Sequence, residues 1–282
     1  MNNLRQYLAE RFPLGITASH ALATSAMLVG IAARNQPLPD RIWSTLGIAT
    51  TFFFFMLRMR VTDEFKDRSH DDANYPNRPV QLGTITTPQL IALGSFALTA
   101  ELVVAFMSGY ATGNPIAILW HLSILGYSLL THFEFFAKSF LERHFNIYFL
   151  IHQQIFILYP VWVFSIWNTD LNSGTLGAAF AFVLYMSAME IVRKYEIRRN
   201  PDGGIVMDTY LSVWKAGAFW AMLGISALGA ILLELLSRNA VHLIIGAITS
   251  ILMLSARTNS EKVRALVAIG FIVQSGVTLT WP

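Results

Sequence analysis

The chain has 282 residues, of which 54% are hydrophobic and only 13% are charged, too few charges to cover a water-soluble domain of this size. It has no cysteine, so disulfides and cysteine-bound metal centres are excluded, and any metal must be held by oxygen or imidazole ligands. The net charge of +3 is gathered in the segments between apolar runs, which argues against a nucleic-acid-binding surface. The composition therefore predicts an integral membrane protein.

Apolar runs follow one another along the chain, each long enough to cross a bilayer core of about 30 Å as a helix. We predict nine spans, at 14–33, 42–60, 88–108, 114–131, 146–167, 174–192, 211–235, 240–256 and 264–281. The segment before the first span carries Glu10 and no small-residue cleavage site, so we expect no removable signal peptide. The expected fold is an all-α, polytopic membrane protein with about nine transmembrane helices around a central cavity.

The basic residues predict the orientation of these spans. If the N-terminus is cytosolic, 17 of the 20 Lys and Arg residues fall in inner segments, and only Arg34, Arg41 and Arg238 lie outside. This asymmetry predicts N-in and C-out, with a bacterial cytoplasmic membrane as the expected location. The two long, charged connections, 61–87 and 193–210, both face the cytosol, so we expect the chemistry there. Their places suggest two four-helix halves and a ninth helix within one domain, 1–282.

The connection after the second span carries a regular run of acids. Asp63, Asp67 and Asp71 are four residues apart, so they stack on one face if the helix continues past the membrane plane. Like charges then repel one another at a helix C-terminus, the end that disfavours anions. Carboxylates of this kind suit Mg²⁺ together with phosphate oxygens, and the neighbouring Lys66, Arg68 and Arg78 suit phosphate itself. The alternative is a solvated loop whose mixed charges neutralise one another.

This loop resembles the first signature of the UbiA superfamily of intramembrane prenyltransferases, Asn-Asp-x-x-Asp-x-x-x-Asp followed by Arg-Pro. Asp63 takes the Asn place, Glu64 the next acid, and Asp67 and Asp71 the two aspartates, while Arg78-Pro79 with Gly83 resembles the ending of the motif. The resemblance implies that Mg²⁺ and an isoprenyl diphosphate are bound here. It implies metal-binding and catalytic roles for Asp63, Asp67 and Asp71. We expect Glu64 to join them as a metal ligand, and Lys66, Asn77 and Arg78 to contact the substrate.

The second long connection departs from the superfamily pattern, because no Asp-x-x-x-Asp is present at the end of the sixth span. Glu190 is the acid in this place, and an ionised carboxylate in an apolar helix needs a partner or a metal. We expect Glu190 to assist metal binding and catalysis, and Arg193 and Lys194 to bind the diphosphate. The alternatives are that Arg193 and Lys194 are structural partners of Glu190, and that the basic run beginning with them is an orientation signal.

Two residues near the inner ends of the fourth and fifth spans are candidates for the acceptor pocket, Glu134 and His152. A carboxylate or imidazole there is suited to accept the proton that alkylation releases. The predicted function is Mg²⁺-dependent transfer of a prenyl group from an allylic diphosphate to an aromatic or other lipophilic acceptor in the membrane. The alternatives are a terpene cyclase of the same superfamily, transfer of a phosphosugar to a polyprenyl phosphate, and a transporter without catalysis.

Overall fold

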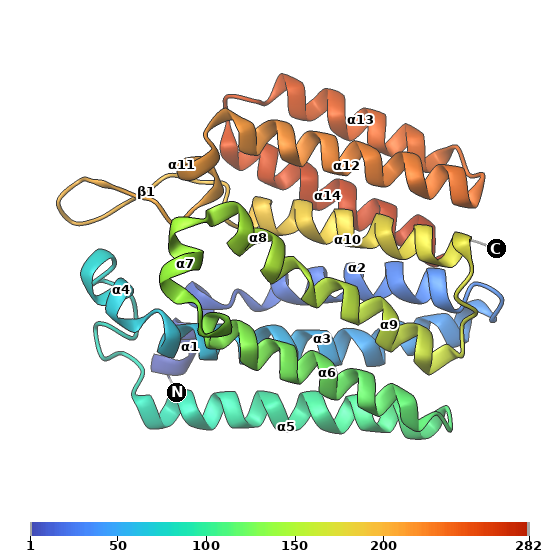
Figure 1. The fold of residues 1–282 in the computed structure, drawn as a ribbon, viewed down its shortest axis with the longest axis horizontal. Coiled ribbons are helices and arrows are strands. Elements are labelled where there is room, and N and C mark those ends of the chain that lie inside the picture. The colour runs from blue at the N-terminus through green and yellow to red at the C-terminus, as the bar shows by residue number, and fades with distance from the viewer. Residues whose placement is uncertain (1, 281–282) are drawn as a thin grey trace. The chain divides into compact units, whose positions relative to one another are not determined.

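The computed structural model describes residues 2–280, and almost all of its elements are helices (Figure 1). The elements are α1 (Asn2–Arg11), α2 (Leu14–Ala32), α3 (Leu38–Lys66), α4 (Arg68–Asn74), α5 (Thr87–Ala111), α6 (Pro115–His132), the 3₁₀ turn η1 (Glu134–Phe136), α7 (Lys138–Arg143), α8 (Phe145–Gln153), α9 (Ile155–Trp167), α10 (Ser173–Arg193), β1 (Arg198–Arg199), β2 (Ile205–Val206), α11 (Tyr210–Trp214), α12 (Ala216–Ser237), α13 (Val241–Ser255) and α14 (Ser260–Leu279).

Each predicted span overlaps one or two of these helices. Within residues 2–280, seven segments are long and apolar enough to cross a membrane: Leu14–Ala32, Leu38–Lys66, Thr87–Ala111, Phe145–Trp167, Ser173–Arg193, Ala216–Ser237 and Ser260–Leu279. The two remaining predicted spans are the shorter helices α6 and α13, of 18 and 15 residues. The prediction of an all-α, multi-pass membrane protein is confirmed, while the count of nine spans and their orientation stay predictions.

Three predicted spans differ from the helices in extent or continuity. Helix α3 runs from Leu38 to Lys66 and so extends beyond the predicted span 42–60 at both ends. The fifth span is interrupted at Gln154, which separates α8 from α9. The seventh is interrupted at Lys215, whose φ of 53° ends α11 before α12 begins. Neither interruption has a glycine or proline at the break, so the sequence carried no signal for it.

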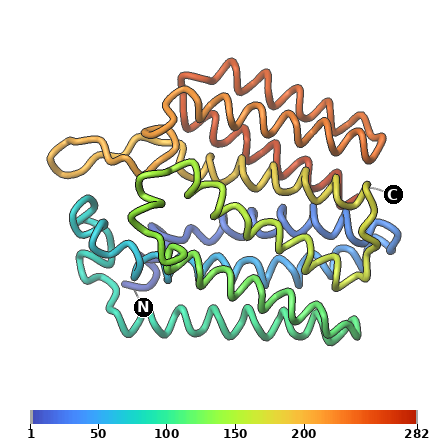
Figure 2. Tube along the Cα trace, in the orientation of Figure 1, coloured from blue at the N-terminus to red at the C-terminus, as the bar shows by residue number. Residues whose placement is uncertain are grey.

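The chain forms two compact units. Unit 1 contains the chain up to Ser25 and Trp43–Asn168, and unit 2 contains Ala26–Ile42 and the chain from Thr169 onward. The tube in Figure 2 follows the chain through the helices of each unit. The expected four-helix pseudo-repeat stays a prediction.

Unit 1 has a buried polar cluster among its transmembrane helices. Arg58 on α3 donates from Nε to Glu101 Oε2 on α5 at 2.7 Å and from Nη2 to Glu101 Oε1 at 3.1 Å. Its Nη1 donates to Ser128 on α6 at 2.9 Å, and His121 Nε2 lies 3.3 Å from Glu101 Oε1. All four side chains are buried. Charges this deep in apolar helices are stable only when paired, so the cluster joins α3, α5 and α6.

Unit 2 depends on close helix contacts at small residues. A Cβ added to Gly30 on α2 would fall well under 3.0 Å from the backbone of Thr278 on α14, and one at Gly246 on α13 would meet Ala230 on α12. Without a side chain, these glycines let neighbouring helix backbones approach closely, as is usual between transmembrane helices.

Replacing Gly30 by alanine is expected to destabilise the protein by about 1–3 kcal/mol, because the added methyl group must push α2 away from α14. The matched control is Gly276→Ala on α14, where an added Cβ meets nothing within 4 Å and should be neutral or slightly stabilising. Thermal unfolding in detergent measures both variants. Equal midpoints for them would contradict this packing.

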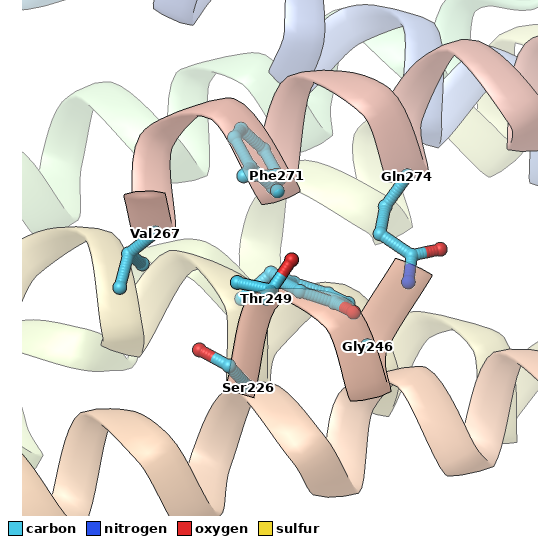
Figure 3. Close-up of a pocket in the computed structure, with 8 residues that line it drawn as sticks. Ser226, Gly246, Thr249, Val267, Phe271 and Gln274 are labelled. Carbon is cyan, nitrogen blue, oxygen red and sulfur yellow. The ribbon is translucent and has the colours of Figure 1, made fainter. Parts of the chain in front are cut away.

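Helices α10, α12, α13 and α14 of unit 2 also line a partly open pocket of about 10 Å³, whose walls include Ser226, Thr249, Phe271 and Gln274 (Figure 3). This volume is about that of one water probe. The pocket can hold a single water molecule and is too small for an isoprenoid or an aromatic acceptor.

Candidate functional site

The acidic run of unit 1 lies on an almost continuous helix. The backbone nitrogen of Asp67 donates to Asp63 O at 2.9 Å, that of Asp71 to Asp67 O at 2.8 Å, and that of Tyr75 to Asp71 O at 2.7 Å. Helical hydrogen bonding therefore passes from the end of α3 through Asp67 into α4, as the four-residue spacing suggested. The three carboxylates differ in exposure, however: 29% of the Asp63 side chain, 45% of Asp67 and 6% of Asp71 are exposed.

Asp63 and Asp67 share one cation, the ammonium group of Lys66. Lys66 Nζ lies 3.9 Å from Asp63 Oδ1 and 3.8 Å from Asp67 Oδ1. A third carboxylate reaches it from η1, since Glu134 Oε1 is also 3.8 Å away. The sequence had placed Glu134 in an acceptor pocket, and the structure places it beside the acidic run as well.

Asp71 is held by arginines. Arg78 Nη1 donates to Asp71 Oδ2, and Arg11 Nη2 on α1 lies 3.7 Å from the same oxygen. The Arg78 guanidinium also stacks on Tyr75, 3.8 Å from the ring centroid. Burial by itself raises the pKa of Asp71, but the hydrogen bond with His70 and the charges of Arg78 and Arg11 outweigh it, so the pKa lies below its usual value.

The lowered pKa predicts a pH dependence of stability. The ionised form of Asp71 stabilises the fold above the carboxyl's unfolded pKa of about 3.9, and this contribution is lost as the pH falls below that value through the lower folded pKa. Wild-type protein should therefore lose more thermal stability between about pH 5 and pH 3 than Asp71→Asn. Asp72→Asn, at the exposed neighbouring residue, should retain the wild-type profile. Parallel profiles for wild type and Asp71→Asn would refute this assignment.

Glu64 lies on the buried side of the same helix. Arg11 Nε donates to Glu64 Oε1 at 2.8 Å, and the Glu64 side chain is fully buried. Burial, and then the Glu64 carboxylate, raise the pKa of Tyr7 on α1 well above its usual value, so this phenol stays protonated. In the structure Glu64 is therefore a partner of α1, and its role as a metal ligand stays a prediction.

The remaining predicted residues of unit 1 lie in two places. Asn77 is exposed. His152 lies on α8, where its ring stacks on Tyr148 with centroids 3.9 Å apart and its Nδ1 lies 2.8 Å from Tyr148 O. Phe135 of η1 packs edge-on against His152, with ring centroids 6.1 Å apart. The residue next to Glu134 therefore packs against the His152 ring.

In unit 2, the Glu190 carboxylate is paired mainly with an arginine of its own helix, α10. Arg193 Nε and Nη2 donate to the two Glu190 carboxylate oxygens at 2.8 Å each, and Tyr210 Oη donates to Oε1 at 3.2 Å. Lys194 is the residue that directly follows the last residue of α10. This is the structural partnership that the spacing allowed, and the proposed metal and diphosphate roles of Glu190, Arg193 and Lys194 stay predictions.

Comparison with solved structures gives two whole-chain matches. A digeranylgeranylglyceryl phosphate synthase is 19% identical with a TM-score of 0.55, and the match covers 98% of this chain and 99% of that one. A UbiA homologue from Aeropyrum pernix K1 is 16% identical with a TM-score of 0.59, over 93% of this chain and 96% of that one. The chain has the UbiA fold. No protein-family model and no curated protein sequence matches it.

The fold that the resemblance implied is thus confirmed, and the roles of the residues in the acidic loop stay predictions. Whether the residues on this fold suit Mg²⁺ can be judged from their oxygens. Asp63 and Asp67 fit, because both already reach one shared cation and remain partly exposed. Asp71 is occupied by arginines, and among the described residues no group of three His or acidic side chains is arranged to hold a metal.

Several contacts of this UbiA fold were missed from the sequence. In the sequence, Arg11 is only one of the basic residues that predict membrane orientation, yet it pairs with Glu64, 53 residues away. The approach of Glu134 to Lys66 was also missed, although both residues had been singled out. No local sequence pattern predicts such long-range ion pairs. The only available signal was that each is a charged residue near the predicted inner end of an apolar span.

Proposed function

We propose that this protein transfers a prenyl group from an allylic isoprenyl diphosphate to a lipophilic acceptor within the membrane. The observation that carries the proposal is the pair Asp63 and Asp67, two partly exposed carboxylates that share one cation where a helix of the UbiA fold leaves its apolar segment. The similar solved structure of a digeranylgeranylglyceryl phosphate synthase supports the same class of chemistry. We also propose that the loop faces the cytosol of a bacterial cell.

In this proposal Asp63 and Asp67 would hold Mg²⁺, and the charge of the ion would make the diphosphate a better leaving group. Lys66 and Arg78 donate hydrogen bonds to the diphosphate oxygens. Arg78 is well prepared for this role, since Asp71 and the Tyr75 ring fix its guanidinium. Asp71 thereby acts as a positioning residue for Arg78.

The group-transfer step breaks the bond between the allylic carbon and the diphosphate oxygen, and the diphosphate leaves with the electron pair. A nucleophilic atom of the acceptor bonds to the allylic carbon and then releases a proton. Glu134 or His152 accepts this proton. The acceptor is proposed to be aromatic or another lipid-soluble molecule.

Product analysis tests the proposal. Purified protein with Mg²⁺ and allylic diphosphates of graded length is incubated with aromatic and lipid acceptors, and the organic extract is examined by mass spectrometry. A product with the summed mass of prenyl group and acceptor, less one proton, is expected. A cyclic hydrocarbon formed without acceptor indicates the cyclase, and a phosphosugar on polyprenyl phosphate indicates the third alternative. No product with any donor is the result expected of a transporter.

A further inference from the structure

Lys66 is an unusual neighbour for a metal-binding acidic run. Only 12% of its side chain is exposed, and its ammonium group lies among Asp63, Asp67 and Glu134 at 3.8–3.9 Å from each. Two of these carboxylates come from its own helix end and the third from η1. Three carboxylates thus converge on one ammonium ion, at distances longer than the bonds that a divalent ion forms with oxygen.

The backbone of η1 brings Glu134 to this position at a cost. Glu134, Phe135 and Phe136 have φ values of 48°, 53° and 57°, and the left-handed region costs an L-residue roughly 1–2 kcal/mol. Strained backbone of this kind persists only where the surrounding structure holds it in place, and it is frequent at functional sites. The attraction between the Glu134 carboxylate and the Lys66 ammonium offsets part of this strain.

The cluster is electrostatically paired but not saturated with hydrogen bonds. All three contacts of Lys66 Nζ are longer than a hydrogen bond, so its N–H groups still need acceptors within reach. Glu134 Oε2 is buried and has no hydrogen-bond partner among the described residues. The ammonium group and this carboxylate oxygen can therefore each form a further contact with a ligand. For the Lys66 ammonium, an anionic phosphate oxygen is a suitable partner.

We propose that the Lys66 ammonium is the resident cation of the acidic run, occupying the place of a divalent metal ion until an anionic substrate arrives. Protein without diphosphate then binds divalent metal only weakly, because metal and ammonium repel each other and compete for Asp63, Asp67 and Glu134. The inference rests on the proposed function only for the identity of the anion. The competition itself depends on the geometry alone.

A manganese titration tests the competition without any diphosphate. Free Mn²⁺ is followed by electron paramagnetic resonance while detergent-purified protein is added. Lys66→Gln should bind Mn²⁺ at least about tenfold more tightly than wild type, because one positive charge leaves the centre of three carboxylates. Lys66→Arg keeps that charge and should stay within twofold of wild type.

The matched control is Arg68→Gln, which removes one charge from an exposed position two residues away. Its Mn²⁺ affinity should change by less than about twofold, because water and salt screen an exposed charge. Equal affinities for wild type and Lys66→Gln would overturn the inference, and so would equal tightening by Arg68→Gln or Lys66→Arg. Because no diphosphate is present, the titration tests the competition between Lys66 and metal independently of whether the protein transfers prenyl groups.

Discussion

Replacing Asp67 by alanine is expected to abolish turnover while leaving the protein folded in the membrane. Asp67 is the most exposed of the three spaced aspartates and reaches the cation that it shares with Asp63. Removing one preorganised group from a charge-stabilising site commonly costs about 100–1,000-fold in rate, and we expect a kcat loss in this range or greater. Steady-state pyrophosphate release from purified protein measures the loss.

Asp72→Ala is the matched control for this variant. Asp72 lies on α4, the short helix that follows Asp67; it is exposed and accepts a hydrogen bond from Gln81 Nε2 at 3.2 Å. It does not belong to the four-residue repeat, so its replacement should leave kcat within about twofold, as for most exposed sites. Full activity of Asp67→Ala would contradict the proposed site. An equal loss in both variants would show that the loop, rather than the carboxylate, is needed.

The largest effect on stability is expected at the buried pair of Arg58 and Glu101. Glu101→Ala leaves the Arg58 guanidinium buried among apolar helices without a counter-charge, and breaking a buried pair typically costs about 3–5 kcal/mol. Replacing both residues by methionine removes both charges and should restore most of the stability. Unfolding in detergent of increasing denaturing strength compares the single and double variants.

An exposed ion pair of the same unit serves as the reference. Lys138 Nζ lies 3.9 Å from Glu142 Oε1, and more than half of each side chain is exposed. Glu142→Ala should cost no more than about 1 kcal/mol, because water screens such pairs. If Glu101→Ala cost no more than Glu142→Ala, the cluster would not have the structural role assigned to it.

The sequence predicted the helices and the acidic run well, because both depend on local patterns. Long apolar stretches predicted the apolar helices, and the four-residue spacing of Asp63, Asp67 and Asp71 predicted a shared helix face on the condition that the helix continues, which the hydrogen bonds from α3 into α4 satisfy. The predicted span that contains Pro160 is also helical at this proline, which lies inside α9 without ending it. Local periodicity needs no knowledge of tertiary contacts, which explains this success.

The contacts that define the site were not predictable in the same way. Glu134 reaches Lys66 because three consecutive residues without a glycine adopt positive φ, a conformation that propensity argues against. Arg11 reaches Glu64 through tertiary packing of α1. The sequence allowed both a metal-binding role and a structural role for Glu190, and the folded structure shows its pairing with Arg193.

Ionisation of an allylic diphosphate by this protein is tested most directly by the choice of substrate. Purified wild-type protein with Mg²⁺ and a lipophilic acceptor is given an allylic isoprenyl diphosphate or the saturated diphosphate of equal length, and pyrophosphate and phosphate release are both measured. We predict pyrophosphate release from the allylic compound alone, since only that carbon forms a stabilised cation. Equal release from both compounds, or release of single phosphate groups, would indicate a phosphatase and contradict the account.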